Sequence, residues 1–392
     1  MPPPSRCFGL DKREAQWVAR VLGLSIEDLS FGKPIKQKAS VCLPLRVSDG
    51  QTYFVKKGDT GHLDAKRRAR TGRSLRAERA FYALPRNPQP LLPLALGAFL
   101  KEAEPRSEPD RFSESQTLGI DLGVESEFLL ILQDAHHIAL PSFELRQVEA
   151  LPGGLTIPEA RAAIRWLAQF HDAFLVNGSS SGGGGMVGRA DVWPQGGYWT
   201  YAKRAVIFPS DRESSSFTLP NDLTPSIICK EWECLLDRVG GAAPELRDLR
   251  EGPDLSFSRA LSESSGALSR LLSQGSSPSH KSATIVHGDY KAANIFLDKS
   301  GHMASTAVDF QWTGYGYGTT DLLYLLATSL SSSALEEPWQ NWLDYYYNER
   351  GGGESQEGLG RREDFGFQAD LAMADYTRYL VLISSSIFFS FH

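Results

Sequence analysis

The chain has 392 residues, of which 41% are hydrophobic and 22% charged, and this length and composition suit two lobes with sizeable cores rather than a disordered chain. The formal net charge of -6 argues against a nucleic-acid-binding protein, since such proteins are usually basic overall. The four cysteines form no CxxC pair and no zinc set with histidine, which indicates reduced thiols in an intracellular protein.

The two ends of the chain carry no segment that predicts a membrane protein. MPPPSRCFGL at the N-terminus lacks the apolar core of a signal peptide. The longest apolar run, YLVLISSSIFFSFH at the other end, is interrupted by serines and is too short to span a bilayer comfortably. We therefore expect a cytoplasmic protein, and we interpret the last apolar run as a core helix that is cut off early or as an irregular end of the sequence.

The N-terminal part, to about residue 130, is predicted to be rich in strands. After a short amphipathic helix over residues 11–24, ASVCLPLRVSDGQTYFVKK predicts two strands joined by a turn at residues 48–50. A basic run over residues 66–76 leads into a helix at AERAFYAL, and we favour a solvated face over an anionic partner for this run. EFLLILQDA is predicted to be a buried strand.

The remainder of the chain is predicted to be rich in helices. LTIPEARAAIRWLAQFHDAFL is the clearest of them, because Thr156 and Glu159 form a capping box with Pro158 in the first turn. His171 lies on its apolar stripe, where a hydrogen-bonded structural histidine is favoured over a catalytic one. NGSSSGGGGMVG and NERGGGESQEGLGRRED are predicted to be flexible loops.

Residues 285–318, IVHGDYKAANIFLDKSGHMASTAVDFQWTGYGYG, concentrate the side chains that could carry chemistry. TIVH, NIFLD and TAVDF are strand-like, so we expect Asp289 and Asn294 on the loop between the first two strands and Asp309 at the end of the third. Carboxylate and amide oxygens are ligands that Mg²⁺ accepts together with phosphate oxygens. Each residue alone could be a turn cap, but the set predicts phosphoryl transfer, in which metal ligands neutralise phosphate charge and a carboxylate orients the attacking hydroxyl.

HGDYKAAN followed by VDFQ resembles the catalytic and metal-binding motifs of the aminoglycoside phosphotransferase and choline kinase family. VDFQ and the following GYGYGTTDLLYLL are similar to the ecdysteroid-kinase-like branch, also called CHK-kinase-like. The resemblance implies an α+β, protein-kinase-like two-lobed fold, with ATP and Mg²⁺ as cofactors. It would divide the chain into a small β-rich N-lobe over residues 1–130, a hinge over 131–137 and a larger helical C-lobe over 138–392.

The resemblance also implies roles for the residues of the second half. Asp289 would be the catalytic base that orients the acceptor hydroxyl, and Asn294 and Asp309 would be the Mg²⁺ ligands. His287 would brace the catalytic loop. Asp321 would anchor that loop from the following helix, as a structural residue.

In the N-lobe, the resemblance implies an ion pair that holds the α- and β-phosphates. Lys56 of TYFVKK matches the family's third strand, and we prefer it to Lys57 because successive strand residues point to opposite faces. Glu78 of LRAERAFYAL would hold this lysine. The hinge FLLILQDAH would bind the nucleotide at Gln133, Asp134 and Ala135.

Two segments depart from the family pattern. SFGKPIKQKAS, where a phosphate loop would lie, has the single glycine Gly32, and Lys36 and Lys38 could compensate by charge. Gln133-Asp134 stands where the family often has two acidic residues, which matters little because adenine usually bonds to hinge backbone.

The predicted function is ATP- and Mg²⁺-dependent transfer of the γ-phosphate to a hydroxyl of a small molecule, such as an alcohol, amino alcohol, sterol or aminoglycoside. The alternative is a catalytically weak or inactive pseudokinase that acts as a binding module, which the glycine-poor loop favours. A two-metal phosphohydrolase is disfavoured, since only His287 among the eight histidines lies in a motif. A protein kinase is disfavoured because GTTDLLYLL follows DFQ so closely that no activation loop fits.

The acceptor is expected to bind the helical insertion around residues 178–260. Four aromatic residues of this insertion could stack on a cation or a ring, although packing is the favoured interpretation. They are Trp193, Tyr198, Trp199 and Tyr201. We expect neither nucleic acid nor a membrane as a partner.

Overall fold

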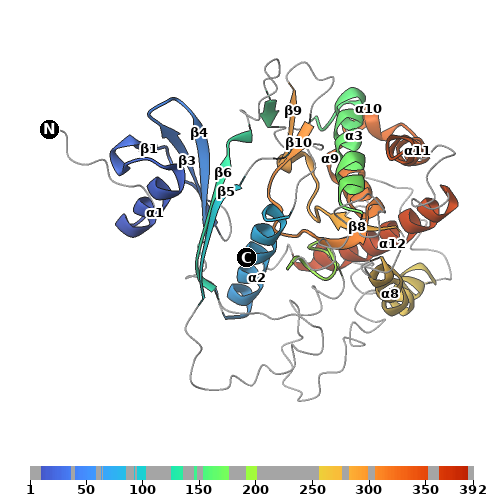
Figure 1. Ribbon diagram of the computed structural model, residues 1–392. Coiled ribbons are helices and arrows are strands. Elements are labelled where there is room, and N and C mark those ends of the chain that lie inside the picture. Colours follow the sequence, from blue (N-terminus) through green and yellow to red (C-terminus); the bar gives the residue numbers. More distant parts are fainter. Residues whose placement is uncertain are drawn as a thin grey trace.

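The structure is a computed structural model of the chain, in which a β-sheet formed by the N-terminal part lies beside a larger, mainly helical part (Figure 1). The described residues are 10–36, 40–58, 63, 65–84, 92, 95–102, 125–135, 145–147, 153–175, 191–200, 256–275, 282–298, 305–351 and 362–386.

The N-terminal sheet is antiparallel, with strand order β1-β3-β4-β6-β5 and with β2 beside β3. The two strands and the turn predicted around residues 48–50 are present as β3 and β4. The strands are β1 (Leu29–Phe31), β2 (Ile35–Lys36), β3 (Ser40–Val47), β4 (Thr52–Gly58), β5 (Ala95–Glu102) and β6 (Glu125–Gln133).

Two helices cover opposite faces of this sheet (Figure 1). Successive residues of a strand point to opposite faces, and β6 follows this alternation. Leu129 belongs to a core that includes residues of α1 (Lys12–Leu22), whereas Leu130 belongs to the larger core that includes residues of α2 (Ala65–Tyr82). The face beside α2 is the one that meets the C-terminal part, so side chains pointing to it can reach a site between the two parts.

The C-terminal part is built around α3 (Ile157–Ala173), the helix that the capping box predicts. At its start, the backbone N–H and the hydroxyl of Thr156 both donate to the Glu159 carboxylate, at 2.9 and 2.7 Å. The other helices are α8 (Ser256–Gln274), α9 (Thr319–Ser329), α10 (Ser332–Leu335), α11 (Trp339–Glu349) and α12 (Arg362–Ser386).

Short strands beside α3 carry the central motifs. β8 (Ala283–Val286) pairs with β11 (Gly314–Tyr317), and β9 (Ile295–Asp298) lies between β7 (Leu145–Gln147) and β10 (Ser305–Ala307). All described residues of β8 to β11 are buried, as in strands enclosed by a core.

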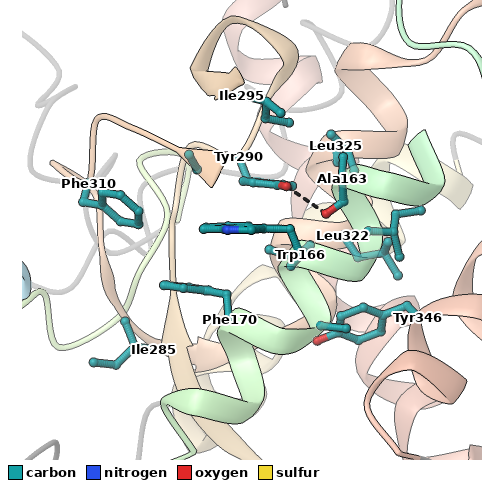
Figure 2. Close-up of a cluster of buried hydrophobic side chains, with 14 of the residues drawn as sticks. Ala163, Trp166, Phe170, Ile285, Tyr290, Ile295, Phe310, Leu322, Leu325 and Tyr346 are labelled. Carbon is teal, nitrogen blue, oxygen red and sulfur yellow. Dashed lines mark hydrogen bonds between the residues drawn. The ribbon is translucent and has the colours of Figure 1, made fainter. Parts of the chain in front are cut away.

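Aromatic side chains join α3 to the loop after β8 (Figure 2). Trp166 stacks on Phe170 with ring centroids 5.1 Å apart and on Tyr290 with centroids 5.5 Å apart. The Tyr290 hydroxyl donates to the Ala163 carbonyl at 2.9 Å, so this buried phenol has the partner that burial requires. The loop therefore rests on a rigid helix.

The α+β fold class and the two-lobed arrangement are confirmed, with the sheet-rich part first and the helical part second. Most of the predicted acceptor insertion lies outside the described residues, as do the loop at 177–188, the middle of the loop at 348–364 and hinge residues 136 and 137. The helix at the end of the chain is described to Ser386. In the described part of the chain, no helix combines the length and the apolar character needed to cross a bilayer.

Candidate active site

Lys56, Glu78 and Asp309 form one buried ion cluster between the two parts of the molecule. The Lys56 ammonium lies 2.9 Å from Glu78 Oε2 and 2.8 Å from Asp309 Oδ1. Lys56 lies on the α2 side of β4, opposite Leu130, whereas Lys57 points to the other face and pairs with Glu14 of α1 at 2.8 Å. The structure thus brings Lys56, rather than Lys57, to the other predicted site residues.

The cluster has two carboxylates for one ammonium, and their pKa values differ accordingly. Burial raises the pKa of Glu78 to about 7, against the attraction of Lys56 and with repulsion from Asp309. Burial also favours a raised pKa for Asp309, but Lys56 outweighs it and lowers the pKa, so this carboxylate stays ionised. The cluster therefore carries excess negative charge, and a cation near Asp309 would stabilise it.

Asp309, in the VDFQ motif, has an unusual backbone conformation. With φ at 69°, it is the only non-glycine with a positive φ among the described residues. This left-handed conformation is uncommon for non-glycine residues and marks a backbone held by its surroundings. Two hydrogen bonds hold it here, because the Val308 N–H donates to the Asn294 carbonyl at 3.0 Å and the Val308 carbonyl accepts from His287 Nε2 at 3.0 Å.

Asp289 lies in the loop after β8, with one carboxylate oxygen hydrogen-bonded and the other without a partner among the described residues. Its Oδ2 accepts from Lys291 Nζ at 3.0 Å and from Asn294 Nδ2 at 3.1 Å. Its Oδ1 is buried and has no hydrogen-bond partner among the described residues. Burial raises the pKa of Asp289, while the nearby Lys291 lowers it. A carboxylate oxygen without a partner can accept a hydroxyl proton.

Asn294 and Asp309 fit a divalent cation that is held together with phosphate oxygens. The Asn294 amide nitrogen donates to the Asp289 carbonyl at 2.8 Å and to its carboxylate, which assigns the amide oxygen to the other side. Within the described ranges, no three His, Cys, Asp or Glu side chains group as a metal site. Mg²⁺ needs no such group, since it keeps waters and uses one or two protein oxygens plus phosphate.

The backbone of the predicted catalytic loop, residues 287–294, is anchored from α9. The Asp321 carboxylate accepts from the N–H of His287 at 2.6 Å and from the N–H of Gly288 at 2.9 Å. Gly288 has φ at 80°, and a Cβ there would lie 2.2 Å from the Trp312 carbonyl oxygen, so this turn requires glycine. Burial lowers the pKa of His287, which keeps its ring neutral and able to accept from the Asp289 N–H at 3.3 Å.

A chain of buried side chains supports Asp321 from behind. His171 Nε2 lies 3.2 Å from Asp321 Oδ2, and its Nδ1 lies 2.7 Å from the Tyr346 hydroxyl. Arg350 donates to Tyr346 at 3.3 Å and to Asp172 at 2.8 Å. Burial lowers the pKa of His171 to about 4, so the neutral ring donates to Asp321 and accepts from Tyr346. His171 is structural, as the sequence pattern favours, but no signal in the sequence points to Tyr346 or Arg350.

Several groups of the predicted hinge and phosphate loop form hydrogen bonds or pair with the N-terminal sheet. The Asp134 carboxylate accepts from the Thr52 hydroxyl at 2.9 Å, and Ala135 is buried, while Gln133 pairs with Tyr53 across β6 and β4. The Gly32 N–H donates to the Pro44 carbonyl at 2.8 Å. The single glycine of the phosphate loop is therefore tied to the sheet. Lys36 is exposed, and Lys38 lies outside the described residues.

The described piece of the insertion, residues 191–200, lies against the catalytic loop. The Tyr198 N–H donates to the Gly288 carbonyl at 3.2 Å, and its hydroxyl lies 2.8 Å from that of Tyr324. Burial raises the pKa of Tyr324, and the charge of Asp289 raises it further, which places this phenol within electrostatic reach of Asp289. Trp199 is 1% exposed and is a core residue, whereas Tyr201 lies outside the described residues.

Comparison with known proteins supports the motif-based resemblance. Residues 242–350 match the model of the ecdysteroid kinase-like family, and this segment contains the catalytic loop, VDFQ and Asp321. The predicted resemblance is thereby confirmed over this segment. No curated protein matches the chain.

Solved small-molecule kinases align with nearly the whole chain, at low similarity. A microcompartment-associated aminopropanol kinase is 14% identical, with a TM-score of 0.39 and coverage of 96% of this chain and 95% of that one. An amicoumacin kinase bound to AMP-PNP and Ca²⁺ is 12% identical, with a TM-score of 0.41 and coverage of 96% and 87%. A Plasmodium vivax ethanolamine kinase is 10% identical, with a TM-score of 0.39 and coverage of 92% and 77%. These likenesses are too slight to bear on the acceptor.

Proposed function

We propose that this protein transfers the γ-phosphoryl group of ATP, with Mg²⁺, to a hydroxyl group of a small-molecule acceptor. The buried Asp289 Oδ1 is the observation that carries the proposal, since it lacks a partner among the described residues while Lys291 and Asn294 hold Oδ2. An acceptor hydroxyl that donates to Oδ1 would be oriented for attack on the γ-phosphorus.

The step requires little of the protein beyond positioning and charge. The acceptor oxygen forms a bond to the γ-phosphorus, its proton passes to Asp289, and the bond from that phosphorus to the β–γ bridging oxygen breaks to release ADP. Lys56 would contact the α- and β-phosphates, held in place by Glu78 at 2.9 Å. Bound Mg²⁺, held by Asn294 and Asp309, would neutralise phosphate charge. The hinge backbone at Gln133, Asp134 and Ala135 would bind adenine.

A pseudokinase that serves as a binding module is the second candidate. The Gly32 N–H favours it, because its hydrogen bond to Pro44 removes one phosphate donor. Against it stands Asp289, since a buried carboxylate oxygen without a partner is costly for folding and has no use in a scaffold. We therefore favour the enzyme, and a cytoplasmic location supplies its ATP and suits its predicted reduced thiols.

The test is Mg²⁺-dependent turnover of ATP against pooled amino alcohols, sterols and aminoglycosides, with phosphorylated product detected by mass spectrometry. Asp289→Asn should lower kcat by about 10²–10⁴-fold, because it removes the proton acceptor. Asp370→Asn is the matched control, since Asp370 is exposed on α12. No product with any pool, together with no Mg²⁺-dependent nucleotide binding, would support the pseudokinase instead.

A further inference from the structure

Arg73 of α2 is buried, although the basic run over residues 66–76 predicts a solvated face. The Arg73 side chain is 7% exposed. Its Nη2 donates to the Val192 carbonyl at 2.7 Å, and its Nη1 donates to the Asp191 carbonyl at 3.0 Å and lies 3.0 Å from Asp191 Oδ1. The predicted solvated face is therefore wrong at this residue, whose guanidinium ties α2 to the described start of residues 191–200.

Two arginines and two tryptophans extend this contact into a stack. The Arg73 guanidinium lies over the Trp193 ring at 5.3 Å, and that of Arg70 lies over Trp312 at 5.5 Å. The two indole rings stack on each other with centroids 5.7 Å apart and an interplanar angle of 18°. Cation–π contacts of this kind are attractive, most of all with tryptophan. We call these four residues the Arg–Trp clamp.

The clamp also reaches the segment that follows Asp309. Trp193 Nε1 donates to the Gln311 carbonyl at 2.8 Å, and the backbone at Trp193 forms a bridge with Gly314. Trp312 comes three residues after Asp309. The clamp thus holds α2 to the same stretch of chain that places the Asp309 carboxylate.

Helix α2 contacts the Asp309 segment at the clamp, through the Lys56–Glu78 pair, and where Phe81 stacks on Phe310. Glu78 holds Asp309 through Lys56, at 2.9 and 2.8 Å. Arg70 lies eight residues before Glu78 in α2, which is about 12 Å along a helix axis. A helix of this length acts as a rigid body, so a shift at the clamp moves Glu78 as well.

The clamp is linked to the acceptor side through residues 191–200. Five residues after Trp193, the Tyr198 N–H donates to the Gly288 carbonyl at 3.2 Å, next to Asp289. The same short segment thus contacts the catalytic loop at one end and the Arg–Trp clamp at the other. A second route from α2 runs through Phe81, which stacks on Phe310 with ring centroids 4.0 Å apart, and Phe310 in turn packs on His287.

We infer that the Arg–Trp clamp couples residues 191–200 to the Lys56–Glu78–Asp309 cluster, with Arg73 as a positioning residue for nucleotide binding. This inference rests on the proposed function, because it concerns the phosphate side of the same site. Its consequence is that nucleotide affinity depends on Arg73, whose hydrogen bonds go to the carbonyls of Asp191 and Val192.

The experiment measures binding of AMP-PNP with Mg²⁺ to the full chain by calorimetry, well below the unfolding temperature. Arg73→Met keeps the apolar stem and removes the guanidinium, and it should raise the Kd about tenfold. Arg79→Met is the control, since Arg79 is exposed on the same helix and should leave the Kd unchanged. Circular dichroism verifies that each variant is folded at the measuring temperature.

A double-mutant cycle separates positioning from packing. Arg73→Met combined with Glu78→Gln should raise the Kd by less than the product of the two single effects, because both act through Glu78. Nucleotide should also change the fluorescence of Trp193 and Trp312 in the wild type and not in Arg73→Met. Multiplicative effects on the Kd with an unchanged fluorescence response would assign Arg73 to packing alone.

The outcomes distinguish this inference from the proposed function. Wild-type binding with an unaltered Kd for folded Arg73→Met would overturn the inference and leave the function standing. Failure of the wild type to bind AMP-PNP with Mg²⁺ would overturn both. If Arg73→Met does not fold, Arg70→Met decides, since it keeps the Arg73 hydrogen bonds and should raise the Kd about threefold, whereas an unchanged Kd would overturn the inference.

Discussion

The catalytic loop and the Lys56 cluster belong to one candidate site, but different interactions hold them. The loop backbone is fixed by Asp321, which in turn is supported by the neutral ring of His171 and the phenol of Tyr346. The Lys56 cluster consists of charges drawn from segments as far as 253 residues apart in the chain. The first is a hydrogen-bond network inside the C-lobe, and the second is an ion cluster across the two lobes.

Because of this difference, we expect substitutions in the two regions to affect different properties of the protein. A hydrogen-bond network with every member buried is costly to break, so changes around the catalytic loop should act mainly on stability. An ion cluster with two carboxylates for one lysine carries excess negative charge, and under the proposed function it faces the nucleotide, so changes there should act mainly on nucleotide binding.

The largest expected effect is the loss of the loop anchor. Asp321→Ala leaves the N–H groups of His287 and Gly288 and the ring N–H of His171 without acceptors in a buried site. We expect the free energy of unfolding to fall by about 3–5 kcal/mol, measured by urea titration. Asp370→Ala, at an exposed position, should change it by less than about 0.5 kcal/mol. A small effect of Asp321→Ala would contradict the loop's dependence on this network.

The buried histidine makes stability depend on pH. Burial lowers the pKa of His171 to about 4, with Asp321, Tyr346, Arg350 and His287 as its charged or titratable neighbours. In the unfolded chain its pKa is about 6.5, so below that pH the unfolded state binds the proton first. The His171 contribution to the free energy of unfolding should therefore fall by about 1.4 kcal/mol per unit as the pH drops from 6.5 to 4, and stay level above 6.5. Glu78, whose pKa burial raises to about 7, contributes with the opposite sign in this range, so the His171 contribution is the difference between the wild type and a variant without this histidine.

His171→Gln provides the control for the pH dependence. A glutamine amide can donate to Asp321 and cannot take up a proton in this range. The variant should be less stable at pH 7 but should lose less stability between pH 6.5 and 4, with a remaining slope from His287, whose pKa burial also lowers. An unchanged slope would mean that His171 is protonated in the folded protein.

In the ion cluster, we expect a substitution to weaken nucleotide binding more than it lowers stability. Lys56→Met should weaken binding of AMP-PNP with Mg²⁺ at least tenfold, about 1.4 kcal/mol, as measured by calorimetry. Stability should fall by less than about 2 kcal/mol, because Glu78, whose pKa is already about 7, can take up a proton. Lys57→Met is the matched control, since Lys57 pairs with Glu14 on the opposite face of β4. Equal effects of the two variants on the Kd would refute the assignment of Lys56.

The last prediction tests how far the hydrogen-bond network extends. Tyr346→Phe removes one hydrogen bond to His171 and one from Arg350 while keeping the ring that packs in the core. The free energy of unfolding should fall by about 1–3 kcal/mol, and the Kd for AMP-PNP should not change. A weaker nucleotide affinity in this variant would show that the two regions are less independent than their contacts indicate.

The same two regions show what sequence reasoning can reach. Asp289, Asn294 and Asp309 lie in one continuous motif, so their spacing alone predicts that they converge. Strand alternation separates Lys56 from Lys57, because this choice depends only on local geometry. Tyr346, Arg350 and Arg73 carry no such signal, since their partners lie 175, 178 and 119 residues away and only the folded chain brings them together.

The measurement that tests the account most directly is binding of AMP-PNP with and without Mg²⁺ to the wild type, Asp309→Asn and Asp289→Asn. We expect the wild type and Asp289→Asn to bind much more tightly with Mg²⁺, and Asp309→Asn to lose that dependence. This result would place the metal and phosphate contacts at Asp309 and show that Asp289 is not needed for them, as its proposed role as proton acceptor requires. Binding that is equal with and without Mg²⁺ in all three proteins would contradict the account.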